Sequence, residues 1–224
     1  MLTETEPYSI LWDNWMFRLR QPTSQSRKPQ IILLLHGLTG DEFSMWVFVQ
    51  QPPQNALFIA PRAPFTTTSK GFSWTNQNHH KFPTTADFSL VTDACIEALE
   101  GLLNNLKYPN CPIHLIGFSQ GAALAYYWAV TYAVKIGKVA CLAGFLPQGI
   151  EPAIKSGALI GKEFFIAHGS LDETVPVHHA REAAQKLQEG KAKVIYCEDN
   201  SGHKLGPSCF RGLNAFIKTI PDIN

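Results

Sequence analysis

The stretch that decides the fold reads Cys111-Pro112-Ile113-His114-Leu115-Ile116-Gly117-Phe118-Ser119-Gln120-Gly121, and an apolar, helix-like run follows at residues 122–128. This order predicts a buried strand, a sharp turn and a helix. Gly117 and Gly121 lack a Cβ atom, so the strand and the helix can approach each other closely around Ser119. The same glycines also fit a plain tight turn with a capping hydroxyl. The flanking strand and helix favour a nucleophile elbow, which would expose the Ser119 hydroxyl at a helix N-terminus.

A nucleophilic serine needs a histidine base and a carboxylate that orients this base, and after such an elbow both are expected downstream. Residues 163–169 predict a buried strand that ends at a glycine, and Asp172 lies in the loop beyond it. A second predicted strand at 192–197 leads to a polar loop that carries His203. We therefore expect Ser119, His203 and Asp172 to form a catalytic triad.

Other histidines and carboxylates are weaker candidates. His178 and His179 follow the acid too closely in the chain to reach the nucleophile, and they fit the solvated start of a helix. His114 lies inside a strand, as a core histidine would, and His168 precedes the acid, where it could line the site. The alternative acids are loop carboxylates of a kind that is usually solvated, namely Glu173, Glu198 and Asp199.

The negative oxygen that develops during acyl transfer needs two backbone N–H donors. One is expected from Gln120, which follows the nucleophile at the positive end of its helix. Residues 31–35 form a continuous apolar run, typical of a strand covered on both faces, and His36-Gly37-Leu38-Thr39-Gly40 follows at its C-terminal end. A flexible turn would also explain these glycines. Beside a triad, the loop favours the Leu38 N–H as the second donor.

With these motifs in order, the chain resembles the small carboxylesterases and acyl-protein thioesterases of the phospholipase/carboxylesterase group of α/β hydrolases. The resemblance covers about residues 29–219, and one departure is Ala122, where many relatives carry a second glycine. It implies a serine esterase with Ser119, Asp172 and His203 as the triad and Leu38 and Gln120 as the oxyanion hole. The motifs that carry it are His36-Gly37-Leu38, Ala60-Pro61-Arg62-Ala63-Pro64, Ser73-Trp74, Gly117-Phe118-Ser119-Gln120-Gly121, His168-Gly169 with Asp172 and Val175-Pro176, and Gly202-His203.

Length and composition indicate one domain over residues 1–224. A chain of this length with 45% hydrophobic residues buries about 70% or more of its unfolded surface, so it needs neither disulfides nor metals for a core. The net charge is +1, from 19 Lys and Arg against 18 Asp and Glu, and no basic block is longer than Arg27-Lys28. This balance argues against nucleic acid or an anionic membrane as the main partner. The oligomeric state is left open.

The cysteines and the N-terminus predict a cytoplasmic protein. The five cysteines are odd in number and lack C-x-x-C spacing, so we expect buried, unpaired thiols in a reducing compartment. The N-terminus is acidic and lacks an apolar core, which argues against a signal peptide, and no run of about 18 apolar residues predicts a membrane span. The histidines and cysteines also lack metal-ligand spacing, so we expect no metal and no cofactor.

Alternation along the chain predicts an α/β fold with a mostly parallel central sheet covered by helices, and the resemblance narrows this to the α/β-hydrolase fold. Substrate is then expected at the C-terminal ends of the strands. The predicted helices lie near 87–106, 120–135, 177–189 and 207–219. The predicted strands lie near 10–20, 31–35, 56–60, 112–117, 138–143, 163–168 and 192–197.

Two segment lengths bear on the substrate. About twenty residues separate the strands at 138–143 and 163–168, too few for a helical cap domain, so we expect an open site. Residues 62–86 have little helical periodicity but many aromatic side chains, which favours a binding or lid segment over a mobile surface loop. The side chains expected to contact the acyl chain, besides Leu38, are Phe43, Phe72, Trp74, Phe145, Leu146, Leu171 and Val175.

The sequence therefore predicts a serine carboxylesterase or thioesterase that cleaves short to medium acyl esters, from a small molecule or a lipid, through an acyl-serine intermediate. A serine peptidase or amidase is the alternative enzyme, and it is disfavoured because no accessory domain would select peptides. A hydrolase-fold binding protein would need a broken triad. The sequence leaves open the natural acyl donor, the leaving group and the preference between ester and thioester.

Overall fold

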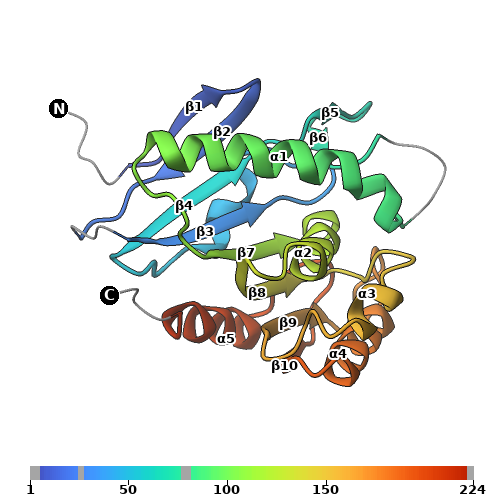
Figure 1. Cartoon of the computed structure of the whole chain (residues 1–224). Coiled ribbons are helices and arrows are strands. Elements are labelled where there is room, and N and C mark those ends of the chain that lie inside the picture. Colours follow the sequence, from blue (N-terminus) through green and yellow to red (C-terminus); the bar gives the residue numbers. More distant parts are fainter. Residues whose placement is uncertain (1–5, 25–27, 77–81, 221–224) are drawn as a thin grey trace.

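The structure is a computed structural model that describes residues 6–24, 28–76 and 82–220. At its centre is an eight-stranded sheet with strand order β1-β2-β4-β3-β7-β8-β9-β10 (Figure 1). β2 pairs antiparallel with β1 and β4, and all other neighbours in the sheet are parallel, so the predicted α/β-hydrolase sheet is confirmed. The strands are β1 (Tyr8–Trp12), β2 (Trp15–Arg20), β3 (Gln30–Leu35), β4 (Ala56–Pro61), β7 (Ile113–Phe118), β8 (Ile136–Leu142), β9 (Glu163–Gly169) and β10 (Lys193–Asp199).

The apolar run of β3 is continuous because both faces of the sheet are buried. Ile31, Leu33 and Leu35 point into one hydrophobic core, and Ile32 and Leu34 point into a second core on the opposite face. All five side chains are fully buried. Burial of each contributes about 1.5–3 kcal/mol of hydrophobic free energy, so β3 is fixed at the centre of the sheet.

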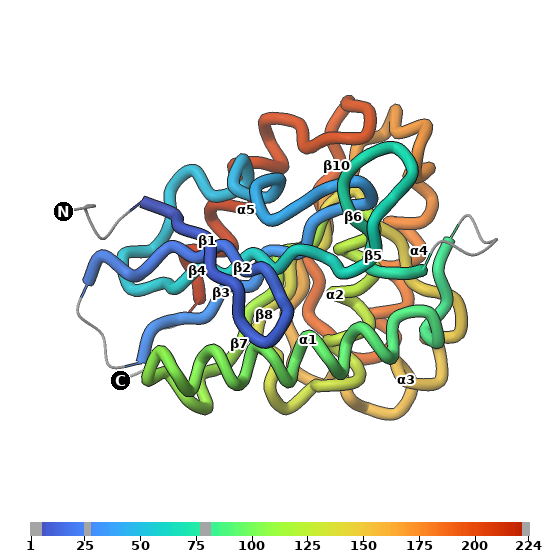
Figure 2. Tube along the Cα trace, turned by 90° about the horizontal axis from the view of Figure 1, so that it is seen from above, coloured from blue at the N-terminus to red at the C-terminus, as the bar shows by residue number. Residues whose placement is uncertain are grey.

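Helices cover both faces. α1 (Thr85–Asn105), α2 (Gln120–Thr131) and α4 (His178–Glu189) contribute side chains to the first core, whereas α5 (Pro207–Lys218) and the short 3-10 helix η1 (Ser44–Phe48) contribute to the second. Figure 2, seen from above, shows α1 on one side of the sheet and α5 on the other. No helix in the described ranges is long and apolar enough to cross a membrane.

The N-terminal strand differs from its prediction. One strand was expected near 10–20, but the structure has the hairpin β1–β2, in which Trp12 pairs with Trp15. The two residues between them, Asp13 and Asn14, have φ values of 47° and 62°. Asp and Asn tolerate this left-handed conformation, and two such residues in succession form a tight hairpin turn.

Two segments around the strand ends bear on access to the site. Between β8 and β9 the only helix is the short α3 (Glu151–Lys155), so no helical cap is inserted there. In the long segment at 62–86, β5 (Phe65–Thr66) and β6 (Phe72–Ser73) form a small antiparallel hairpin that the sequence did not predict. Residues 77–81 of this segment lie outside the described residues.

The prediction of five unpaired cysteines is wrong. Cys197 and Cys209 form a disulfide that joins β10 to the first turn of α5. Their sequence separation of 12 carries no recognisable signal, because it is the loop after β10 that folds back and brings the two side chains together. Cys95 and Cys141 are buried free thiols, and Cys111 is a half-buried one. The cytoplasmic location, which rested partly on unpaired thiols, stays a prediction.

Candidate active site

Ser119 lies on the turn between β7 and α2, with φ 54° and ψ −114°. This unusual conformation follows from the close approach of strand and helix. A Cβ atom on Gly117 would lie 2.2 Å from the Gly121 carbonyl oxygen, and one on Gly121 would lie 2.1 Å from the Leu35 carbonyl oxygen. Only glycine fits at either position, so the sequence pattern and the elbow geometry have the same physical cause.

Ser119, His203 and Asp172 form a continuous chain of contacts. His203 Nε2 lies 3.1 Å from Ser119 Oγ, and His203 Nδ1 lies 2.7 Å from Asp172 Oδ2. The other carboxylate oxygen, Oδ1, accepts hydrogen bonds of 2.9 Å from the backbone N–H groups of Thr174 and Val175. Because the carboxylate accepts at Nδ1, the neutral His203 ring carries its proton there and turns the Nε2 lone pair toward Ser119.

Contacts between two loops bring the acid and the base together. The loop after β9 carries Asp172, and the loop after β10 carries His203. Ser170 N–H donates to the Asp199 carbonyl at 2.8 Å, and Leu171 N–H donates to the Ser201 carbonyl at 3.0 Å. A Cβ atom on Gly169 would lie 2.2 Å from the Ser201 carbonyl oxygen, so this glycine permits the loops to touch.

Gln120 is the first residue of α2, and a helix provides no acceptor for the N–H groups of its first turn. The Gln120 side chain is buried and holds this end of the helix in place. Its Oε1 accepts from the Trp74 backbone N–H at 3.0 Å, and its Nε2 donates to Thr75 Oγ1 at 3.2 Å. The Gln120 N–H therefore has a fixed direction beside Ser119.

The orientation of the Gly37–Leu38 peptide follows from two hydrogen bonds. The Gly37 carbonyl accepts from the His36 Nδ1–H at 2.7 Å and from the Gly40 N–H at 3.0 Å. In a trans peptide the C=O and N–H groups point in opposite directions, so the Leu38 N–H points away from both donors. A Cβ atom on Gly37 would lie 3.3 Å from Ser119 Cβ, which places this peptide beside the nucleophile.

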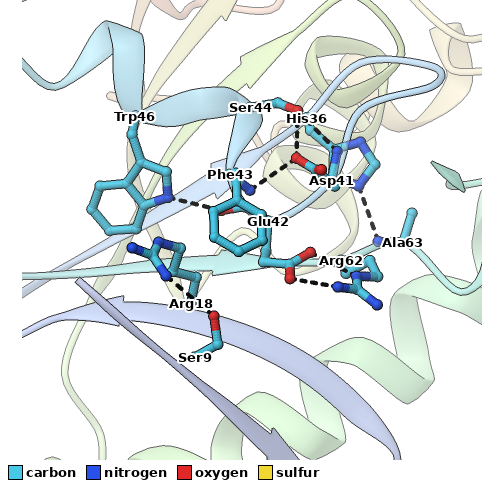
Figure 3. Close-up of polar contacts among 10 residues, drawn as sticks. All are labelled: Ser9, Arg18, His36, Asp41, Glu42, Phe43, Ser44, Trp46, Arg62 and Ala63. Atoms are coloured by element: carbon cyan, nitrogen blue, oxygen red, sulfur yellow. Dashed lines mark hydrogen bonds and ion pairs between the residues drawn. The ribbon is translucent and has the colours of Figure 1, made fainter. Parts of the chain in front are cut away.

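The His36 ring, which holds this peptide, is restricted to one tautomer by its hydrogen bonds. Its Nε2 accepts from the Ala63 backbone N–H at 3.0 Å, so its proton must be on Nδ1 (Figure 3). The ring is fully buried, and it packs against the Trp74 indole with ring centroids 5.1 Å apart. The indole Nε1–H donates to the His36 carbonyl at 2.7 Å. Burial lowers the pKa of His36, which keeps the ring neutral and its hydrogen bonds intact.

An ion pair with a buried carboxylate and a partly exposed guanidinium supports the same loop. The Arg62 guanidinium binds both carboxylate oxygens of Glu42, at 2.6 and 2.5 Å, and Glu42 is only 1% exposed. The Trp46 indole donates to the Glu42 carbonyl at 2.7 Å, and Figure 3 shows this contact beside the ion pair. Arg62 also lies over the Phe72 ring, 4.7 Å from its centroid. Arg62 belongs to the Ala60–Pro64 motif, but its partner is not evident from the sequence, because nothing in the spacing links position 62 to position 42.

The β5–β6 hairpin is joined to the loop of residues 37–40 by backbone hydrogen bonds. Thr39 N–H donates to the Phe72 carbonyl, and Phe72 N–H donates to the Gly40 carbonyl, both at 2.9 Å. Gly71 has a φ of +83°, and a Cβ atom there would lie 1.9 Å from the Thr39 carbonyl oxygen. The aromatic segment and the candidate oxyanion loop therefore form one hydrogen-bonded unit.

The side chains expected to contact the acyl chain fall into three groups. Leu38, Phe43 and Leu171 are exposed, at 46%, 52% and 62%, and Phe72 and Leu146 are half-buried. Three others are buried, namely Trp74 at 0%, Val175 at 3% and Phe145 at 4%. Trp74 thus offers no surface to a substrate in this structure, because its ring fills the space behind His36 and supports the loop instead.

The alternative bases and acids have other contacts. His178 is exposed, and the ring of His179 packs 4.6 Å from that of Phe82. Glu198 forms an ion pair with Arg181. Asp199 accepts hydrogen bonds from Ser208 Oγ at 2.5 Å and from Cys209 N–H at 2.9 Å, at the start of α5. Among the described residues, the one cluster of possible metal ligands consists of Cys197, Asp199 and Cys209, and the disulfide already engages both sulfurs.

Comparisons with known proteins relate the whole chain to esterases and thioesterases. A model of the phospholipase/carboxylesterase family matches residues 21–220. The chain is 33% identical to acyl-protein thioesterase 1 of Saccharomyces cerevisiae, over 84% of this chain and 92% of that protein. It is 27% identical to acyl-protein thioesterase 1 of Candida albicans, over 90% and 96% of the two chains. A carboxylesterase structure from Mesorhizobium loti shares the fold with a TM-score of 0.80 at 20% identity, covering 94% of this chain and 99% of that one.

Proposed function

The chain belongs to the phospholipase/carboxylesterase family, and on this basis we propose that Ser119, His203 and Asp172 are the catalytic triad of an ester-hydrolysing enzyme. The observation that carries the proposal is the unbroken chain of contacts from Ser119 Oγ through the His203 ring to Asp172, at 3.1 and 2.7 Å. These are hydrogen-bond distances for proton transfer from a nucleophile to its base.

The proposed mechanism is a two-step acyl transfer. His203 Nε2 accepts the Ser119 proton while Oγ attacks the carbonyl carbon, and the Leu38 and Gln120 N–H groups stabilise the resulting oxyanion. Collapse of the intermediate breaks the bond to the leaving alcohol or thiol, which takes the proton from His203. Water then attacks the acyl-serine with the same assistance and releases the carboxylic acid. Asp172 orients His203 and stabilises its protonated form.

The proposed substrates are short to medium acyl esters and thioesters. Leu38 lies in the proposed oxyanion loop, Leu171 directly precedes the proposed catalytic acid, and both side chains are exposed, so an acyl chain bound at Ser119 would meet apolar surface. Each methylene that this surface buries would contribute up to about 0.8 kcal/mol to transition-state binding. The absence of a helical cap between β8 and β9 supports an open site.

A labelling and rate experiment tests the proposal. A fluorophosphonate should label the wild-type chain at Ser119 only, and Ser119→Ala should lower kcat by about 10³–10⁶-fold without unfolding the protein. Rates should then be compared across esters, thioesters and amides of increasing acyl length. Label at another residue would contradict the triad, and efficient amide cleavage would favour a serine peptidase or amidase.

A further inference from the structure

His168 lies beneath the proposed catalytic acid, and the mechanism above gives it no role. It is the penultimate residue of β9 and is 1% exposed. Its Nε2 donates a hydrogen bond of 2.7 Å to the Val175 carbonyl, and the same nitrogen lies 3.3 Å from Asp172 Oδ2. His203 Nδ1 approaches this same carboxylate oxygen at 2.7 Å. Two imidazole rings therefore face one oxygen of the acid.

The tautomer of His168 follows from these contacts. A carbonyl oxygen only accepts hydrogen bonds, so the contact with Val175 requires a proton on Nε2. Nδ1 is buried, and none of the described residues provides a hydrogen-bond partner for it. A second proton on Nδ1 would therefore create a buried cation with an unsatisfied N–H group, which is costly.

The charged groups around the ring are few. Asp172 lies at Nε2, Glu198 is the register partner of His168 on β10, and His203 lies beyond the acid. Glu198 is held by Arg181 in an ion pair with a hydrogen bond from each of two guanidinium nitrogens. Burial is the largest influence on the ring and lowers the pKa of His168. The ring is thus a neutral donor of fixed direction.

We propose that His168 is a positioning residue for the catalytic acid: its Nε2–H donates to the Val175 carbonyl and so holds the turn of residues 172–175, and this N–H dipole lies beside Asp172 Oδ2. This role rests on the triad proposed above. The Val175 carbonyl that His168 holds belongs to the residue whose N–H donates to Asp172 Oδ1, so the ring fixes the turn that orients the carboxylate. The dipole also offsets part of the carboxylate charge, and it thereby limits how strongly Asp172 stabilises protonated His203.

The test is the pH profile of kcat/KM for four variants of the full chain. In His168→Leu the Asp172 carboxylate loses the neighbouring N–H dipole, so it should stabilise protonated His203 more strongly. The midpoint of the ascending limb of the kcat/KM profile should therefore move to higher pH by up to about one unit. The limiting kcat of His168→Leu should fall about 10-fold. Asp172→Asn should lose much more, about 10⁴-fold. His168→Gln, whose side-chain amide can donate at a similar reach, should restore the wild-type midpoint. His114→Leu removes a buried histidine elsewhere on the sheet and should leave the midpoint unchanged.

A purely structural role for His168 would lower thermal stability without moving the midpoint, so an unshifted midpoint in His168→Leu overturns the proposal. If that variant does not fold, nitrogen-15 NMR of the histidines in the wild-type chain decides instead. The neutral His168 ring should show an Nε2–H tautomer, and an Nδ1–H tautomer overturns the proposal. Full activity in Ser119→Ala or Asp172→Asn would contradict the proposed function itself, whereas inactive variants of these two residues with an unshifted His168→Leu would contradict only the positioning role.

Discussion

Replacement of His36 by phenylalanine should weaken both the fold and the proposed oxyanion loop of residues 37–40, and the two effects can be measured separately. His36→Phe removes the acceptor of the buried Ala63 N–H and one of the two donors to the Gly37 carbonyl. An unsatisfied buried N–H costs about 1–3 kcal/mol, and the second lost hydrogen bond adds about 1 kcal/mol. The free energy of unfolding should therefore fall by about 2–4 kcal/mol.

The same substitution should lower kcat. Loss of a complete oxyanion donor costs about 10²–10³-fold in kcat. In His36→Phe the Gly37 carbonyl keeps the Gly40 N–H as a donor at 3.0 Å, so the Leu38 N–H should be misaligned rather than lost. We expect a decrease in kcat of about 10–100-fold with little change in KM, because this donor acts mainly on the charge that develops in the transition state.

His114→Phe is the matched control. His114 is also buried, at 6% exposed, and its Nδ1 accepts a hydrogen bond of 3.0 Å from the Lys138 backbone N–H. Urea unfolding should show a loss of stability in both variants, about 1 kcal/mol larger in His36→Phe because it breaks one hydrogen bond more. In contrast, kcat on a short ester and the affinity for a trifluoromethyl ketone should fall only in His36→Phe. Equal kcat values in the two variants, measured where both are folded, would refute the role of His36 at the oxyanion loop.

Three further predictions concern stability and substrate contact. Reduction with dithiothreitol should lower the free energy of unfolding by about 2–3 kcal/mol in urea titrations, and Cys197→Ser should abolish this effect of the reductant. Burial lowers the pKa of His114 to about 4 from an unfolded value of 6.5, so the unfolded chain binds the extra proton first. Stability should therefore fall as the pH drops from 6.5 to about 4, by about 3 kcal/mol from this group, and urea titrations of His114→Asn should show a smaller fall. Trp74→Phe should destabilise the protein by about 1–3 kcal/mol through the unpaired His36 carbonyl, and a comparison of ester rates should show an unchanged acyl-length profile, since Trp74 has no exposed surface.

The sequence predicted those parts of the protein that short-range physical constraints determine. The elbow around Ser119 was predictable because only glycine fits at positions 117 and 121, and the central strands because their apolar runs are buried on both faces. The loop positions of Asp172 and His203 were predictable because each residue follows a recognisable strand. Each expectation needed only local sequence and the rule that parallel strands end at one edge.

Long-range contacts were not predictable in this way. The hydrogen bond from Ala63 to His36 spans 27 positions, and the ion pair of Glu42 and Arg62 spans 20, with no periodicity to reveal either. Trp74 illustrates the same limit. An aromatic residue in a long loop has the composition of a binding segment, but a hydrogen bond from its indole to His36 places it in the core.

The two backbone hydrogen bonds between Phe72 and the loop of residues 37–40 have a consequence for how this enzyme can change over evolution. Loops often carry binding residues and tolerate insertions and deletions. Here the two backbone hydrogen bonds join the β5–β6 hairpin to the proposed oxyanion loop. An insertion or deletion in the hairpin would therefore shift the positions of Thr39 and Gly40 as well. New specificity is then more accessible through side-chain substitutions on the exposed face of this unit, such as at Leu38 or Phe43, than through transplanted loops.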